Sequence, residues 1–354
     1  MIRNLFNCIS IHNGGGIVYL SLMHNDLDKK GNLILLDERA RYKLKPFLHA
    51  EIKYLKKNLF RNIFVLNERV KHTLIFRNYK RKKNKNEFLN EYYLNGIPPF
   101  FRFSAFSNKV FILFQNRNLF YYLNYLNGQL FISFNFIIYH ALHSTLINIF
   151  LKETDFILAQ TKTMFKLLSY SKPRNKVILK DLYWKNLNLE SYLNKTINNT
   201  KISCNFEKKQ IKMIEEKAAN NKLFFYPASL DPHKNHKRLF RSFNKIHKMN
   251  YKKIILLVTL DSSQLPRETR NNKQIIFLGS QSIKFINQIY NLVDFLIFPS
   301  LNESLGLPLI EASLHNLPII ASELDYVYDV CKPYLTFNPF SEKDIFRKIV
   351  ESVE

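Results

Sequence analysis

The 354-residue chain contains few cysteines, few glycines and few acidic residues. Its three cysteines, Cys8, Cys204 and Cys331, lie far apart and form no CxxC pair. This spacing excludes a disulfide scaffold and argues against a structural zinc site, and it fits a reducing compartment. The first residues show no signal-peptide cleavage pattern, so we expect a cytoplasmic protein.

Charge of either sign is missing from residues 130–151, a stretch about as long as a bilayer requires. Polar residues interrupt it at Asn135, His140, His143, Ser144 and Asn148. Polar side chains are costly in hydrocarbon. We therefore favour a buried or interface-touching segment over a membrane span.

Acidic residues are scarce beside basic ones, 28 against 53, which gives a net charge of +25. Residues 1–200 hold most of the excess, with 31 basic and 12 acidic residues. A charge of this size implies an anionic partner, which leaves nucleic acid, a membrane surface or a phosphorylated ligand open.

The chain alternates short apolar runs with amphipathic stretches. The apolar runs, rich in Ile, Leu, Val and Phe, are typical of strands buried on both faces. Strands are predicted at residues 5–11, 33–36, 63–66, 73–76, 110–114, 156–159, 223–226, 254–259, 275–278, 295–298, 318–321 and 334–337. Helices are predicted at residues 17–26, 47–57, 235–248, 282–292, 304–314 and 342–350.

This alternation predicts an α/β chain with two doubly wound domains. Residues 191–200 are polar and rich in Asn, with weak periodicity, as linkers are. We therefore expect an N-terminal domain over residues 1–200 and a C-terminal domain over residues 201–354.

Only eight glycines occur, and Gly14, Gly15 and Gly16 follow the first predicted strand directly. At that place in an α/β sheet, ligands meet the carboxyl ends of strands, and glycine lets a phosphate approach the backbone. A tight strand–helix turn explains the cluster equally simply. The pattern is not GxGxxG, and no acidic residue ends the next predicted strand before Asp37, which argues against a nicotinamide cofactor.

A second segment, residues 299–312, joins a predicted strand to a helix and contains Glu303 and Glu311. Eight residues are about two helical turns, so both carboxylates can face one pocket. The backbone N–H groups of Ser304, Leu305 and Gly306 at the helix start suit a phosphate. Two carboxylates beside a phosphate would repel it unless they accept hydrogen bonds, and ribose or sugar hydroxyls can donate these. The alternative is structural: Glu303 is a solvated helix cap and Glu311 is a surface residue of the helix.

A third segment, residues 227–239, is a loop with a dense basic set before a predicted helix. Cations at a helix N-terminus oppose its dipole, so a polyanion would account for them. We expect Lys234 to neutralise a diphosphate and Asn235 to cap the helix. The alternative is a solvated surface loop.

Together these segments resemble the family 4 retaining glycosyltransferases, or glycosyl transferases group 1. The resemblance implies the GT-B architecture, in which two doubly wound Rossmann-like domains face a cleft. The family's signature F-P-S-x-x-E-S-x-G-x-P-x-x-E-A is matched by Phe298, Pro299, Ser300, Glu303, Ser304, Gly306, Pro308, Glu311 and Ala312. Pro232, His233, Lys234 and Asn235 are similar to the family's proline–basic–Lys-Asn loop. The resemblance is strong only over residues 224–321.

The resemblance implies a catalytic role for Glu303 and Lys234. It further implies that Glu311, Asn235 and the Ser304, Leu305 and Gly306 segment bind a nucleotide-sugar donor. Gly279 and Gln281 would lie near the nucleobase, and Gly15 and Gly16 would close over the diphosphate. The donor is a substrate, and neither a cofactor nor a metal is implied.

The chain departs from the family at two places. Ser229 stands where many members have an Arg, so diphosphate neutralisation rests more heavily on Lys234. Many members present a His from the first domain, but Gln115 and Asn116 stand where it is expected, and neither His140 nor His143 can be assigned that role.

Asp26 and Asp28 spell the DxD motif, which binds the metal in metal-dependent glycosyltransferases. They fall at a predicted helix end, however, where acidic residues are ordinary.

The resemblance therefore predicts transfer of a sugar from a nucleotide-diphosphate sugar to a surface-glycan or lipid-linked acceptor. The basic first half, interleaved with aromatics such as Phe47 and Tyr54, suits an anionic membrane surface, at the inner face of the cytoplasmic membrane. Three alternatives stay open: a sugar-nucleotide epimerase or phosphorylase, a nucleic-acid-binding protein, and an inactive partner. No nucleic-acid-reading motif is present, so we do not expect nucleic acid as the partner.

Overall fold

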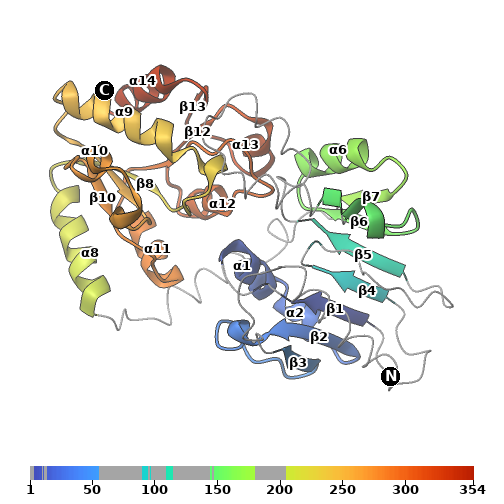
Figure 1. The fold of residues 1–354 in the computed structure, drawn as a ribbon. Helices are drawn as coiled ribbons and strands as arrows, with labels where there is room; N and C mark the ends of the chain where they lie inside the picture. The colour runs from blue at the N-terminus through green and yellow to red at the C-terminus, as the bar shows by residue number, and fades with distance from the viewer. Residues whose placement is uncertain are drawn as a thin grey trace. The chain divides into compact units, whose positions relative to one another are not determined.

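The computed structural model describes residues 4–9, 11, 14–55, 90–94, 96, 109–114, 144–145, 147–179 and 205–354. The chain divides into two compact units, Met1–Leu187 and Asn188–Glu354, and each unit contains one sheet of parallel strands (Figure 1). The predicted boundary between residues 200 and 201 lies outside the described residues and stays a prediction.

The first sheet has seven strands in the order β3-β2-β1-β4-β5-β6-β7. They are β1 (Asn4–Cys8), β2 (Asn32–Asp37), β3 (Glu51–Leu55), β4 (Asn90–Tyr93), β5 (Lys109–Leu113), β6 (Phe156–Ala159) and β7 (Lys176–Leu179). The helices of this unit are α1 (Gly14–Leu22), α2 (His24–Leu27), the short 3-10 turn η1 (Glu38–Ala40) and α6 (Lys162–Ser171).

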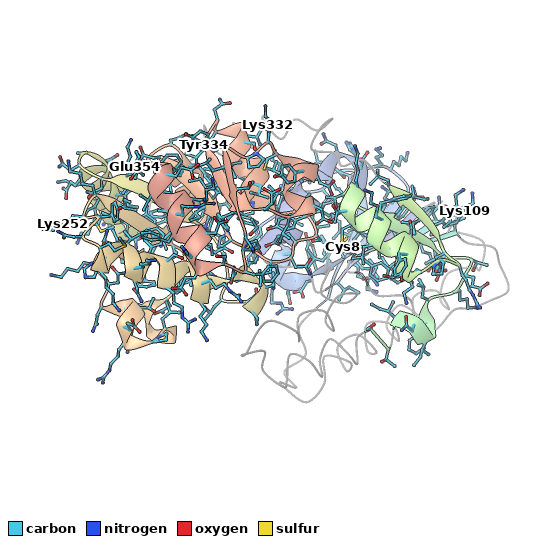
Figure 2. The ribbon with its side chains drawn as sticks, turned by 90° about the horizontal axis from the view of Figure 1, so that it is seen from above. Cys8, Lys109, Lys252, Lys332, Tyr334 and Glu354 are labelled. Atoms are coloured by element: carbon cyan, nitrogen blue, oxygen red, sulfur yellow. The ribbon has the colours of Figure 1, made fainter. Side chains whose placement is uncertain are left out.

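One face of the first sheet carries a row of stacked rings. Parallel pairing aligns Phe6 of β1, Tyr92 of β4, Phe111 of β5 and Phe156 of β6, with ring centroids 4.7, 4.8 and 5.0 Å apart. At such separations the rings add to the stability that burial alone supplies. Cys8, labelled in Figure 2, ends β1 and is fully buried; burial raises the pKa of its thiol, which leaves it inert.

The helix predicted at residues 47–57 is wrong, because Glu51–Leu55 form the edge strand β3. Glu51 and Lys53 interrupt the apolar run that marks the other strands, but β3 pairs with β2 along its whole length. The predicted helix at residues 17–26 is broken at Met23 into α1 and α2. Strands β4 and β7 were not predicted, and the strands predicted at residues 63–66 and 73–76 lie outside the described residues.

The second sheet has six strands in the order β10-β9-β8-β11-β12-β13. They are β8 (Lys222–Tyr226), β9 (Ile254–Val258), β10 (Ile275–Phe277), β11 (Phe295–Phe298), β12 (Ile319–Ser322) and β13 (Leu335–Phe337). The helices are α8 (Asn205–Ala218), η2 (Pro232–Lys234), α9 (His236–Lys248), η3 (Ser262–Gln264), α10 (Arg267–Arg270), α11 (Ile283–Tyr290), α12 (Leu307–Leu314), α13 (Asp325–Val330) and α14 (Glu342–Glu351). Helices α9 and α14 pack against each other (Figure 1).

All strands and helices predicted for the second unit are present, with ends shifted by a few residues. The central strands β9, β11 and β12 are buried along their whole length, which explains their unbroken apolar sequence. The sheet order reverses between β8 and β11: the chain moves outward from β8 through β9 and β10 and then returns to β11 on the other side. In open α/β sheets, ligands bind at this switch point, beyond the carboxyl ends of the strands.

Most of residues 130–151, predicted to be a buried segment, lie outside the described residues. Within the described part, Ile147 is buried against Ile112 and Ile157 in the core of the first unit. Among the described residues, no helix has both the length and the apolar sequence needed to cross a membrane.

Candidate active site

The loops that follow β8 and β11 are joined at the switch point of the second sheet. The carbonyl of His233 accepts a hydrogen bond from the backbone N–H of Leu301 at 2.8 Å and lies 3.2 Å from Ser300 Oγ. Segments that are almost seventy residues apart in sequence are thereby held together.

At this junction Lys234 and Glu303 form an ion pair. Lys234 Nζ lies 2.6 Å from Glu303 Oε1, and the two side chains are only 15% and 11% exposed. Ser300 Oγ donates to the same Oε1 atom at 2.5 Å, and the Tyr226 hydroxyl donates to the Lys234 carbonyl at 2.9 Å. Tyr226 therefore holds the backbone of Lys234, and Ser300 holds the carboxylate of Glu303.

Asn235 does not cap α9 with its side chain, so that expectation is wrong. Its backbone is left-handed, with φ 58° and ψ 27°, which directs the amide inward instead. Asn235 Nδ2 donates to the carbonyls of Pro299 at 3.0 Å and Pro339 at 2.8 Å, and its Oδ1 accepts from Arg238. Asn235 thus ties the Lys234 loop to the segment that precedes Glu303.

Helix α12 begins at Leu307, later than predicted, because Gly306 takes a left-handed conformation at its N-cap. A Cβ atom at Gly306, where φ is 71°, would lie 3.1 Å from Leu309 Cδ1. Among the described residues, the backbone N–H groups of Leu305 and Gly306 have no hydrogen-bond partner. With Ser304 they precede the positive end of the helix, where anions bind favourably.

Glu311 lies one turn into α12, half-buried, and is held by Tyr290 of α11. The Tyr290 hydroxyl donates to Glu311 Oε2 at 2.8 Å. Tyr290 is 2% exposed and packs between Phe225 and His315, with ring centroids 5.5 and 5.3 Å away. Burial raises the pKa of Glu311, although the Tyr290 bond acts in the opposite direction. The other oxygen, Oε1, has no partner among the described residues and can accept a hydrogen bond from a ligand.

Gly279 and Gln281 follow β10, which β9 separates from β8. Gly279 has φ 73° and open space around its Cα. Gln281 Nε2 donates to Gln210 Oε1 at 2.9 Å and to the Leu278 carbonyl, which anchors this turn to α8. Gly279 and Gln281 therefore lie in a turn at the end of β10, two strands away from β8, whose loop carries Lys234.

The remaining predicted residues belong to the first unit. Gly15 and Gly16 lie in the first turn of α1, after β1. Gln115, Asn116, His140 and His143 lie outside the described residues.

Asp26 and Asp28, the DxD pair, both have partners within the first unit. Asp28 accepts hydrogen bonds from the backbone N–H groups of Leu48, His49 and Ala50, at 2.7 to 3.0 Å. Burial opposes its charged form, but these bonds hold the pKa of Asp28 at about 2. Asp26 pairs with Lys29 at 2.7 Å. In the described parts of the chain, no cluster of three His, Cys, Asp or Glu residues could hold a metal ion.

Three tyrosines that support the site were not predicted from the sequence. Besides Tyr226 and Tyr290, Tyr326 donates its hydroxyl to the Ser300 carbonyl at 2.7 Å. All three are buried and lie on strands or helices some distance along the chain. Their burial is consistent with apolar positions of amphipathic elements, but no sequence pattern links a tyrosine to a particular carboxylate.

Comparisons with known proteins bear on the family and the fold. Residues 207–350 match the family model described as "Glycosyl transferases group 1". No curated protein is significantly similar to the chain in sequence.

Similar solved structures cover both units. HepE of Anabaena, crystallised with UDP and glucose, is 14% identical with a TM-score of 0.60, over 100% of this chain and 90% of that one. Sucrose-phosphate synthase from Thermosynechococcus elongatus is 13% identical with a TM-score of 0.66, over 99% and 90%. WaaG, a glycosyltransferase involved in lipopolysaccharide biosynthesis, is 10% identical with a TM-score of 0.63, over 98% and 90%. At such low identity these likenesses show the fold.

The family match covers the second unit, including both loops of the switch point. Residues 207–350 are therefore a glycosyl transferases group 1 domain, and with the two Rossmann-like sheets of the GT-B fold the protein is a glycosyltransferase that takes its sugar from a nucleotide-sugar donor.

Proposed function

We propose that the chain transfers a sugar from a nucleoside-diphosphate sugar to a surface-glycan or lipid-linked acceptor, with Lys234, Glu303 and Glu311 as its central site residues. The observation that carries this assignment is the Lys234–Glu303 pair beside the N-terminus of α12. Lys234 and the backbone N–H groups before α12 can bind a diphosphate. The carboxylates of Glu303 and Glu311 nearby can accept hydrogen bonds from hydroxyls, so the site suits a ligand that carries both groups.

In this proposal the diphosphate binds to the N–H groups of Leu305 and Gly306 and to Lys234. Glu311 Oε1 accepts hydrogen bonds from the ribose hydroxyls, because Tyr290 already occupies Oε2. Glu303 accepts a hydrogen bond from a hydroxyl of the donor sugar. Asn235 holds the loop that carries Lys234, and Ser304 belongs to the segment that leads to the N-terminus of α12. Gly279 and Gln281 face the base.

The reaction breaks the bond between the anomeric carbon and the diphosphate oxygen, whose electron pair leaves with the diphosphate. Negative charge grows on that leaving group, and Lys234 with the helix N–H groups stabilises it. Positive charge grows at the anomeric carbon, where the nearby oxygens of Glu303 are favourable. The acceptor hydroxyl forms the new bond and loses its proton, which the departing phosphate takes.

Lys234 neutralises the diphosphate without help from the arginine that many family members have five residues earlier. Ser229 stands there, and its hydroxyl donates to Asp231 instead of contributing a positive charge. We therefore expect diphosphate affinity to depend steeply on Lys234.

The acceptor assignment rests on two features. The first half of the chain carries most of the +25 net charge, which suits an anionic membrane surface where lipid-linked acceptors are found. The similar structure WaaG takes part in lipopolysaccharide biosynthesis. A peripheral position at the inner face of the cytoplasmic membrane follows from the same reasoning.

Thermal-shift measurements of the full chain with nucleoside diphosphates and nucleotide sugars test the donor assignment, because a ligand stabilises the state that binds it. We expect Lys234→Ala and Glu311→Ala to abolish both the shift and sugar transfer. Lys222→Ala, which removes an exposed ion pair with Asp294 in the same unit, is the matched control and should change neither. Full turnover by Lys234→Ala and Glu311→Ala would refute the site. Conversion of the donor to an isomer without acceptor would favour an epimerase, and a shift with RNA alone would favour a nucleic-acid binder.

A further inference from the structure

The connection between β2 and β3 has an unusual surface. Residues 41–50 link η1 to the outermost strand of the first sheet without a helix. They include Arg41, Lys43 and Lys45, all exposed, and no acidic residue. This connection is therefore a basic strip at one edge of the first sheet.

The same connection exposes two large apolar side chains. Tyr42 is 92% exposed and Leu48 is 80% exposed. Apolar side chains set among cations, rather than among mixed charges, are typical of protein segments that lie in the interface of an anionic bilayer.

Several contacts fix the backbone of the connection while leaving these side chains outside. Asp28 accepts from the N–H groups of Leu48, His49 and Ala50. The His24 ring stacks on Phe47 with centroids 4.5 Å apart, and its Nε2 donates to the Pro46 carbonyl at 3.2 Å. The display of Tyr42 and Leu48 is thus built into the fold, and Asp28, whose sequence context imitates a metal motif, has the role of anchoring it.

We propose that residues 41–50 dock the first unit onto an anionic lipid bilayer. Tyr42 and Leu48 enter the interfacial layer, and Arg41, Lys43 and Lys45 contact the lipid phosphates. The use of this contact for an acceptor rests on the proposed function, but the docking itself depends only on the observations above. Unlike a general attraction between a basic protein and anionic lipid, this docking requires both the charges and the two apolar side chains at one edge.

The test is co-sedimentation of the full chain with phosphatidylcholine vesicles that contain or lack phosphatidylglycerol. The unchanged chain should bind only the anionic vesicles. Arg41→Gln/Lys43→Gln/Lys45→Gln should lower the partition coefficient by about a hundredfold, because each of the three basic residues near such a surface contributes about a fivefold factor. Tyr42→Ser/Leu48→Ser should lower it by at least about tenfold, through lost apolar burial.

Matched controls separate this site from net charge and from exposure in general. Lys208→Gln/Lys209→Gln/Lys212→Gln removes the same charge from exposed positions of α8, and Tyr170→Ser removes a side chain that is 89% exposed on α6. Both should bind vesicles like the unchanged chain. Equal losses in the controls, or full binding by Tyr42→Ser/Leu48→Ser, would overturn the proposal. Thermal shifts with UDP, measured on the same variants, report on the donor site separately, so either proposal can fail alone.

Discussion

Lys234 Nζ and Glu303 Oε1 lie 2.6 Å apart, so the cation and the carboxylate proposed to act on the donor neutralise each other within the protein. The pair holds Lys234 in one place before any ligand arrives, which lowers the ordering cost of binding. A diphosphate then competes with Glu303 for the same ammonium group. Glu303, released in part, is left with an oxygen that can accept from a sugar hydroxyl.

This pairing predicts strong coupling between the two side chains in stability as well as in activity. Lys234→Met and Glu303→Gln should each destabilise the chain by about 1–3 kcal/mol, because the remaining partner loses its counter-charge in a largely buried place. The double variant should lose less than the sum. A double-mutant cycle by scanning calorimetry of the full chain measures the difference.

The control for that cycle is Lys222→Met with Asp294→Asn, a pair at 2.8 Å whose side chains are 54% and 29% exposed. Exposed pairs contribute little, so its coupling should stay below about 1 kcal/mol. Equal coupling in both cycles would mean that the Lys234–Glu303 pair is no more than a surface contact.

Tyr290→Phe isolates the orientation of Glu311. Losing the hydroxyl bond leaves Glu311 free to rotate, and we expect about a tenfold weaker Kd for UDP with a smaller effect on the fold. Tyr328→Phe is the matched control, since the Tyr328 hydroxyl donates to Glu323 at 2.6 Å on the exposed surface. Calorimetric titration of the two variants compares them. A Kd unchanged by Tyr290→Phe would show that Glu311 needs no positioning.

The second sheet was predictable because its strands are buried on both faces and leave unbroken apolar runs in the sequence. The edge strand β3 was not, because an edge position permits Glu51 and Lys53 and therefore leaves no unbroken apolar run in the sequence. The site residues divide in the same way, into those with a local sequence pattern and those without one. Glu303, Gly306 and Glu311 were predicted from their local spacing, whereas Tyr290 reaches Glu311 only through the packing of α11 on α12, which no local pattern encodes.

Asn235 also shows what a local pattern misses. The residue before a helix was expected to be a cap, but its buried amide joins three segments. Asn235→Ala should cost about 2–4 kcal/mol, from the three lost side-chain hydrogen bonds and a left-handed backbone at φ 58°. Asn235→Gly loses the bonds but tolerates that backbone, so it should be about 1 kcal/mol less harmful. Calorimetry of both variants distinguishes the two contributions, and equal losses would assign the whole effect to the side chain.

His236 gives the second unit a predictable response to acid. Its ring is buried between Tyr226 and Phe240, its Nε2 donates to the Ser229 carbonyl at 2.8 Å, and its Nδ1 is buried without a partner among the described residues. Burial lowers the pKa of His236 from 6.5 to about 4. The folded chain therefore resists a proton that the unfolded chain accepts.

The sign of the effect follows from that difference. Above pH 6.5 both states are neutral at His236 and the full stability is present; as the pH falls toward 4, only the unfolded state gains the proton and stability is lost, by at most roughly 3 kcal/mol. His236→Phe keeps the ring packing and removes the titration, so its calorimetric Tm should fall less between pH 7 and pH 4.5 than that of the unchanged chain. His247→Phe, at an exposed position of the same helix, is the control for replacing a histidine by phenylalanine. If His236→Phe retains the full acid sensitivity, other groups must take up the protons and the neutral buried imidazole is not the cause.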